Sequence, residues 1–141
     1  MKQTLLIIPG FGESTSEPQY QWLVKKNQKD FNVVTHTPVW NYRTASAWVD
    51  DLALLLESVD VRNTTVIAFS LGAFIALIAS ETHHFYKGIF CSLSPFFAEQ
   101  LVYMPEPAKN FLGKRRVADF STHSIPKAIF CKSVFLFGQD D

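Results

Sequence analysis

Short, continuously apolar runs alternate along this chain with longer segments whose apolar residues recur at helical spacing. The apolar runs predict five strands, at residues 5–8, 31–37, 64–69, 87–93 and 133–137. Runs that are apolar at consecutive positions are typical of strands buried on both faces of a parallel sheet. The intervening pattern predicts helices over residues 17–29, 45–59 and 71–79. Strands that alternate with helices indicate a parallel sheet with right-handed crossovers.

The helix boundaries also have signals in the sequence. Ser16 is expected to cap the first helix, with Pro18 in its first turn, and Thr44 is expected to cap the second. The helix that follows residue 70 lacks a polar face and is expected to be buried. Residues 96–132 have a less regular pattern, which we interpret as helical pieces and loop. The basic run 114–116 is expected to be a solvated helix end.

Together these elements predict a three-layer α/β/α sandwich with a mainly parallel sheet, built as one domain over residues 1–141. If the first crossover runs one way and the next returns past it, the strand order is 2-1-3-4-5. In such a sheet, ligands bind where the strand order reverses, at the carboxyl ends of the first and third strands. Phe11 follows the first strand and Ser70 follows the third. We therefore expect the functional site between these two residues.

Ser70 lies where a β-branched strand becomes an apolar helix, which is the setting of a nucleophile elbow. Small residues are needed two positions before and after the serine, because strand and helix pass close together there. Ala68 and Gly72 occupy these positions, so the motif is A-x-S-x-G where the usual pattern has two glycines. The alternative is an ordinary strand-helix junction in which the serine is only structural.

Composition excludes several classes of function. The 13 basic and 13 acidic side chains give a formal net charge of zero, so we expect no nucleic-acid partner. No apolar run approaches the roughly 20 residues of a membrane span, and the first apolar run is shorter than the apolar region of a secretory leader, so we expect a cytoplasmic protein. Cys91 and Cys131 lack metal-ligand spacing and are expected to be reduced core thiols. The G-x-G at residues 10–12 has Thr15 at the position of the third glycine, and no acidic residue ends the second strand, so we expect no dinucleotide. We also expect no other cofactor and no metal.

With these motifs in place, the chain resembles the α/β-hydrolase superfamily, in particular its small members without a large cap. The resemblance rests on the Pro9-Gly10-Phe11-Gly12 loop, the elbow at Ser70 and the strand that ends in Gly-x-x-Asp at residues 138–141. It implies that Ser70 is the nucleophile and that the backbone N–H groups of Phe11 and Leu71 form an oxyanion hole. It also implies that Asp141 is the acid of the triad, with Asp140 next and Glu99 less well placed. Pro9 stands where the family has a histidine.

The family's triad runs in the order serine, acid, histidine, and no residue follows Asp141 in this sequence. We therefore expect a truncated domain that lacks its last helix, strand and histidine loop, and that is inactive by itself. Among the histidines present, His83 and His84 are expected at the far end of the elbow helix. His36 lies near the carboxyl end of the second strand, and His123 in the connection to the fifth. We expect all four to be structural.

Three functions remain open at this point. The first is a serine hydrolase that cleaves a small-molecule carboxylic ester by acyl transfer through Ser70. The second is a non-catalytic relative that binds a small apolar ligand or a protein partner, and the third is an unrelated α/β protein. An apolar substrate pocket is expected from aromatic residues at strand ends and loops, namely Phe11, Trp40, Tyr42, Phe69, Phe96 and Phe97. The apolar run at residues 134–137 would form an exposed sheet edge, which predicts self-association.

Overall fold

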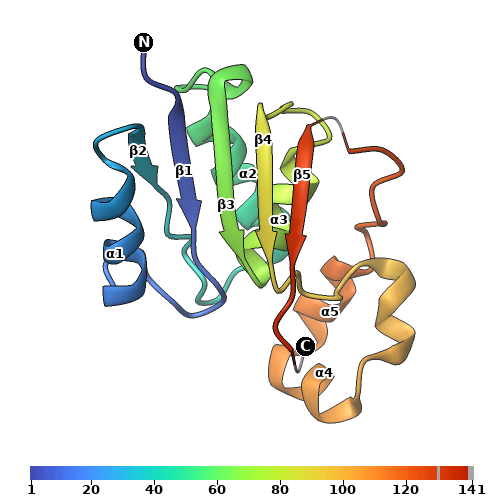
Figure 1. The fold of residues 1–141 in the computed structure, drawn as a ribbon. Coiled ribbons are helices and arrows are strands. Elements are labelled where there is room, and N and C mark those ends of the chain that lie inside the picture. The colour runs from blue at the N-terminus through green and yellow to red at the C-terminus, as the bar shows by residue number, and fades with distance from the viewer. Residues whose placement is uncertain (130, 140–141) are drawn as a thin grey trace.

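The structure is a computed structural model that describes residues 1–129 and 131–139. Its helices are few and short, and its strands are all parallel (Figure 1). In chain order the elements are β1 (Thr4–Ile8), α1 (Pro18–Asn27), β2 (Asn32–Thr35), α2 (Ala45–Leu56), β3 (Thr64–Phe69), α3 (Leu71–Ala79), β4 (Lys87–Cys91), α4 (Glu106–Leu112), α5 (Lys114–Phe120) and β5 (Lys132–Leu136). Two short 3-10 helices span Val61–Asn63 and Ala98–Tyr103.

The sheet has the strand order β2-β1-β3-β4-β5, which confirms the predicted order. β1 pairs with β3 so that Ile8 stands opposite Ala68. Their carboxyl ends therefore stop side by side, at the lower edge of the sheet in Figure 1. This register brings the loop after β1 next to the residue after β3, as the strand reversal predicts.

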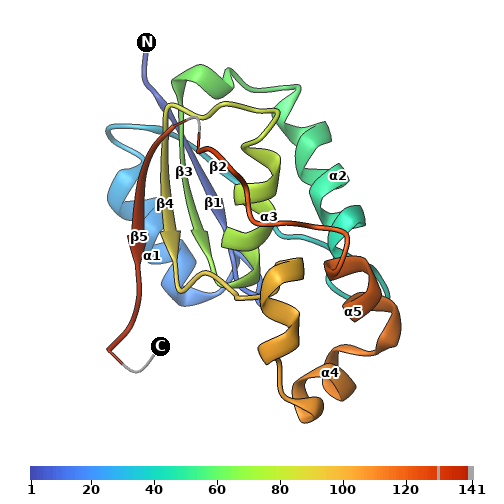
Figure 2. The ribbon, with the colours of Figure 1, turned by 90° about the vertical axis from the view of Figure 1, so that its right-hand side faces the viewer.

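Helices cover both faces of the sheet (Figure 2), with α1 on one face and α2 and α3 on the other. Successive side chains of β1 point to opposite faces of the sheet and pack in different helical layers. Leu5 and Ile7 pack with Tyr20 of α1, whereas Leu6 and Ile8 join the larger core under α2 and α3. This division explains why β1 is apolar at consecutive positions.

α3 is the most deeply buried helix among those described. Every residue from Leu71 to Ala79 except Ile78 is buried, because the helix lies between the sheet and α2. A helix enclosed in this way has no need of a polar face, as its sequence predicts.

The connection from β4 to β5 forms a small helical layer of its own. The second 3-10 helix, α4 and α5 lie beyond the carboxyl edge of the sheet (Figure 1), and α5 packs on α2. Residues 121–129 then return along the helical layer to the amino end of β5 (Figure 2). The sequence predicted helical pieces here without their bounds.

Two helix caps differ from the prediction. α1 begins one residue later than Ser16 predicts, with Glu17 at the cap position and no side-chain cap bond. The Glu17 carboxylate instead accepts a hydrogen bond from the Ser14 N–H at 2.6 Å, so it closes the turn before the helix.

α2 follows Thr44 as expected, but the Thr44 hydroxyl makes no cap bond. The Asp119 carboxylate of α5 accepts hydrogen bonds from the Ser46 N–H at 2.9 Å and from the Ser46 hydroxyl at 2.6 Å. The cap of α2 thus comes from a residue far along the chain. No local pattern predicts such a cap.

Two strands are shorter than the sequence pattern indicates. β4 ends at Cys91 because Ser92 has a φ of 48°, which turns the chain out of the sheet. β2 ends at Thr35, although the His36 N–H still donates to the Ile7 carbonyl at 3.0 Å.

Candidate active site

Ser70 has the backbone of a nucleophile elbow. Its φ of 52° and ψ of −116° lie in a region that residues other than glycine rarely adopt. The conformation is held from both sides, because the Ser70 N–H donates to the Cys91 carbonyl at 2.8 Å and its carbonyl accepts from the Phe74 N–H at 3.1 Å. A strained residue fixed between a strand and a helix is the geometry that exposes a nucleophilic hydroxyl.

Small side chains around the elbow are required by close contacts. A Cβ added to Gly72 would lie 2.1 Å from the Pro9 carbonyl oxygen and 3.1 Å from that of Ile8. A Cβ on Gly10 would lie 3.4 Å from the Cβ of Ser70. Ala68 is completely buried, so its methyl group fits the space that the usual motif leaves to glycine. The A-x-S-x-G pattern is thus sterically compatible with an elbow.

The expected oxyanion donors lie on the two segments that flank Ser70. Leu71 is the first residue of α3, where an N–H has no acceptor within its own helix. Phe11 is on the loop after β1 and shares a cavity with Ser70. Within residues 1–129 and 131–139, neither N–H donates to another residue. Two free backbone donors beside a serine are available to a developing oxyanion.

Ser94 is a site residue that the sequence analysis missed. Its hydroxyl oxygen lies 3.1 Å from that of Ser70, and its N–H donates to the Ser70 carbonyl at 3.4 Å. Ser94 is buried at the end of the loop that follows β4. In the described part of the chain it is the partner of the Ser70 hydroxyl. Ser70 and Ser94 are 24 residues apart in the chain, so no local sequence pattern indicates that their hydroxyl groups meet.

A cavity of about 600 Å³ opens beside Ser70 and is mainly apolar. One wall comes from α1, which the sequence analysis did not assign to the site. The lining residues are Gly10, Phe11, Glu13, Gln19, Tyr20, Trp22, Leu23, Phe69, Ser70, Cys91 and Ser92. Burial raises the pKa of the Cys91 thiol, which keeps this wall uncharged. A second hollow of about 470 Å³ reaches Ser70 from the side of Pro95 and Phe137.

Only some of the aromatic residues predicted to line a pocket do so. Phe11 and Phe69 line the main cavity. Trp40 and Phe97 are buried in the core, and Tyr42 is exposed on its loop. Phe96 lines a separate hollow of about 250 Å³. Aromatic type alone did not distinguish pocket positions from core positions.

Arg116 contacts the loop that carries Phe11. Its guanidinium carbon lies 5.3 Å from the centre of the Phe11 ring and 5.6 Å from that of Trp48. It also donates to the carbonyls of Trp40 at 2.9 Å and Arg43 at 3.0 Å. The expectation of a solvated helix end was therefore wrong for Arg116, although its neighbours 114 and 115 are exposed.

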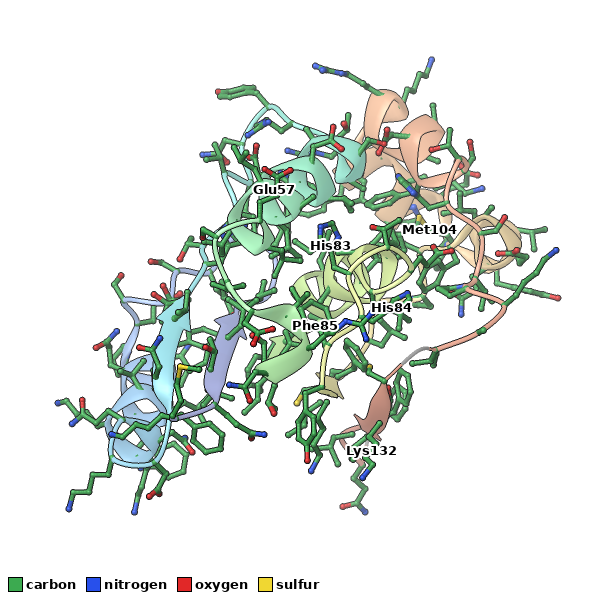
Figure 3. All side chains as sticks on the ribbon, turned by 90° about the horizontal axis from the view of Figure 1, so that it is seen from above. Glu57, His83, His84, Phe85, Met104 and Lys132 are labelled. Carbon is green, nitrogen blue, oxygen red and sulfur yellow. The ribbon has the colours of Figure 1, made fainter. Side chains whose placement is uncertain are left out.

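The histidines lie in three places, and none hydrogen-bonds to Ser70 within the described residues. His83 and His84 are at the amino edge of the sheet, the edge that faces the viewer in Figure 3. His36 follows β2, and burial lowers its pKa. His123 lies 3.0 Å from the Ser46 hydroxyl through Nε2 and stacks edge-on against Phe74.

Asp141, the expected acid of the triad, and Asp140, the next choice, both lie outside the described residues. Glu99 is exposed, and its carboxylate accepts the Ile125 N–H at 2.9 Å. This hydrogen bond is the main reason that the pKa of Glu99 is lowered. The Glu99 carboxylate therefore binds the backbone of the segment that follows α5, at Ile125.

Metal-binding clusters and membrane-spanning helices are both absent from the part of the chain that the structure describes. It holds no group of three or more His, Cys, Asp or Glu side chains arranged to bind a metal ion. Its helices are all too short or too polar to cross a membrane.

Comparisons with known proteins show the family and the fold of the chain. A family model described as "Serine hydrolase" matches residues 5–130. A search of curated proteins found no match. Among solved structures, mouse alpha/beta hydrolase domain-containing protein 10 has a TM-score of 0.81 at 13% identity, over 100% of this chain and 72% of that one. Est1E from Butyrivibrio proteoclasticus gives 0.75 at 12% identity, over 97% and 78%. The ydeN gene product from B. subtilis gives 0.57 at 18% identity, over 94% and 85%. At these identities the likeness concerns the fold.

Proposed function

Because this chain belongs to the serine hydrolase family within the α/β-hydrolase superfamily, we propose that it cleaves carboxylic esters by acyl transfer through Ser70. The observation that carries the proposal is the backbone of Ser70, held at positive φ between β3 and α3. Strain of this kind persists only where surrounding contacts enforce it, and it is concentrated at functional sites.

The chemistry follows from the groups around the serine. The Ser70 hydroxyl attacks the ester carbonyl while its proton passes to a general base, and the alcohol leaves with a proton returned by that base. The N–H groups of Phe11 and Leu71 stabilise the oxyanion that forms in the first step. The Ser94 hydroxyl, 3.1 Å from that of Ser70, restricts the rotamers of the nucleophile. Water then attacks the acyl group and releases the acid.

None of the four histidines described above hydrogen-bonds to Ser70 within the described residues, so these contacts do not identify the general base. His123 is bound to Ser46, while His83 and His84 lie at the opposite edge of the sheet. By resemblance to the family, the proposal takes the general base to be a histidine that reaches Ser70 from outside the described residues. By resemblance to the family, Asp141 would orient that histidine.

The main cavity supports an ester with a neutral, largely apolar group. Trp22, Leu23 and Phe69 provide apolar surface, and about 600 Å³ is within the normal range for a small-molecule pocket. Glu13 lines the same cavity. Its carboxylate would repel a negatively charged substrate group, so we propose that the substrate is uncharged in this region.

The test is covalent labelling of the native protein, isolated from its source cells, with a fluorophosphonate probe that reacts with activated serines. We expect one adduct in the intact mass, lost in Ser70→Ala and retained in the matched control Ser58→Ala, an exposed serine. The intact mass also shows whether the native species is longer than 141 residues. Absence of the adduct in the wild-type protein would contradict the proposal and favour a binding protein on the same fold.

A further inference from the structure

The loop after β1 is held in shape by one residue, Glu13, through both its main chain and its side chain. The Glu13 N–H donates to the Gly10 carbonyl at 3.1 Å, and the Glu13 carbonyl accepts from the Trp40 indole N–H at 3.0 Å. Its Oε2 accepts from the Gly10 N–H at 3.1 Å and from the Tyr20 hydroxyl. A single residue thus links both ends of the turn to α1 and to the segment after β2.

Tyr20 completes this arrangement from α1. It is 3% exposed, and its ring lies edge-on to Phe69 with centroids 5.4 Å apart. Its hydroxyl oxygen accepts from the Gly10 N–H at 3.2 Å while its proton is donated to Glu13. Burial, followed by the hydrogen bond to Glu13, raises the pKa of Tyr20, so the hydroxyl remains a donor throughout the neutral range. Gly10, Glu13 and Tyr20 therefore form a closed ring of hydrogen bonds, which we call the Glu13 ring.

The Glu13 ring lies directly against the nucleophile. A Cβ built on Gly10 would lie 3.0 Å from the Glu13 carboxylate oxygen and 3.4 Å from the Cβ of Ser70. The peptide group that joins Gly10 to Phe11 is held through the Gly10 carbonyl, which accepts the Glu13 N–H at 3.1 Å. That peptide group carries the N–H of Phe11. The Glu13 carboxylate holds the preceding peptide group through the Gly10 N–H.

We propose that Glu13, acting with Tyr20 through Gly10, is a positioning residue that aims the Phe11 N–H at the oxyanion. This inference rests on the proposed function, because it assigns a role in the reaction at Ser70. An oxyanion donor is effective only when it is aligned before the reaction, and small misalignments cost large factors in rate. Glu13 acts by holding the backbone of the loop, because its Oε2 accepts hydrogen bonds from the Gly10 N–H and the Tyr20 hydroxyl.

Three variants separate the parts of the ring. Glu13→Ala removes the carboxylate, Tyr20→Phe removes only the hydroxyl, and Glu13→Gln keeps an oxygen that can accept from both Gly10 and Tyr20. Loss of a whole oxyanion donor costs roughly a hundredfold or more, so partial misalignment in Glu13→Ala is expected to slow the reaction about tenfold. Tyr20→Phe should fall between Glu13→Ala and Glu13→Gln, and Glu13→Gln should be nearest to the wild type.

The experiment uses two readouts on the native protein and its variants. The rate of fluorophosphonate labelling at Ser70, measured against probe concentration, separates the maximal rate from the probe affinity. We expect the maximal rate to fall while the affinity changes less than about twofold. Amide hydrogen exchange then reports the loop directly, and the Gly10 N–H should exchange faster in Glu13→Ala while the amides of β3 keep their protection. Matched controls are Glu57→Gln and Tyr86→Phe, which alter an exposed carboxylate and an exposed tyrosine.

The outcomes distinguish this inference from the proposed function. If wild-type protein labels and Glu13→Ala labels at the same maximal rate, or loses only probe affinity, Glu13 does not position the donor. If wild-type protein does not label, the proposed function fails. In that case unchanged exchange at Gly10 in Glu13→Ala would also overturn the structural role of Glu13, whereas faster exchange would support it.

Discussion

Gly72 is the residue whose size is most tightly limited by the elbow. A methyl group there would lie 2.1 Å from a backbone carbonyl oxygen of Pro9, an atom that cannot move away as a flexible side chain does. We predict that Gly72→Ala lowers the free energy of unfolding by about 2–3 kcal/mol, the upper part of the usual range for overpacking. Urea unfolding followed by circular dichroism measures this loss.

Gly12→Ala is the comparison variant for Gly72→Ala. Gly12 has a φ of 77°, and no atom lies within 4 Å of a Cβ added there. It therefore tests backbone strain without a clash, and about 1–2 kcal/mol is expected. A loss in Gly72→Ala no greater than that in Gly12→Ala would show that α3 can shift away from β1 at little cost.

The same residues show what the sequence reveals at this scale. Ser70, Ala68 and Gly72 are close in the chain, so one local pattern contains the proposed nucleophile and the small residues that its elbow needs. Ser94 and Glu13 are site residues of another kind. Ser94 contacts Ser70 from 24 residues along the chain, and Glu13 contacts Gly10 and Tyr20 around the loop after β1. A serine or glutamate in a loop has no periodic pattern that indicates such a contact.

At the scale of elements, α5 is joined to the site by Arg116. The guanidinium lies over the Phe11 ring and donates to two backbone carbonyls of the segment before α2. We predict that Arg116→Lys lowers the free energy of unfolding by roughly 1–3 kcal/mol, because an ammonium group cannot keep the fork of N–H donors. Thermal unfolding of the variant measures the change.

Arg115→Lys provides the control for Arg116→Lys, since Arg115 is the exposed neighbour on the same helix. Its effect should stay within about 0.5 kcal/mol. Equal effects of the two substitutions would mean that α5 gains its stability from apolar packing alone, without Arg116.

Elements differ in how far the sequence predicts them. β1, β3 and α3 follow from local apolar patterns, because burial on all sides requires such patterns. The layer between β4 and β5 does not, since α4 and α5 have seven residues each and are fixed by tertiary contacts such as the Asp119 cap on α2. Short helices of this kind are marginal without their partners, so propensity alone does not define them.

At the scale of the whole molecule, alternation of strands and helices predicts a parallel sheet with right-handed crossovers. The observed strand order follows when the second crossover returns past the first. Rules of strand order and handedness do not predict where His123 lies. The connection from β4 to β5 extends beyond the carboxyl edge of the sheet, and His123 in its last part contacts Ser46 of α2 and Phe74 of α3.

The described sheet ends in an apolar strand whose side chains are unusually exposed. On β5 and the residue after it, Val134, Leu136 and Phe137 are 41%, 51% and 62% exposed. Phe135 is turned toward Phe90, with ring centroids 5.2 Å apart. A flat apolar edge with free backbone groups is a template for pairing with another strand. We therefore predict that this 141-residue chain self-associates in a concentration-dependent way.

Leu136→Lys tests that prediction at the edge itself. A charge on β5 should oppose strand pairing, so light scattering is expected to show a shift toward the monomer at equal protein concentration. Leu54→Lys is the matched control, because Leu54 is 69% exposed on α2, away from the edge. If both substitutions reduce association equally, general surface charge is responsible. If the unmodified chain is monodisperse and monomeric, the exposed β5 edge does not drive association, and its apolar side chains are tolerated in water.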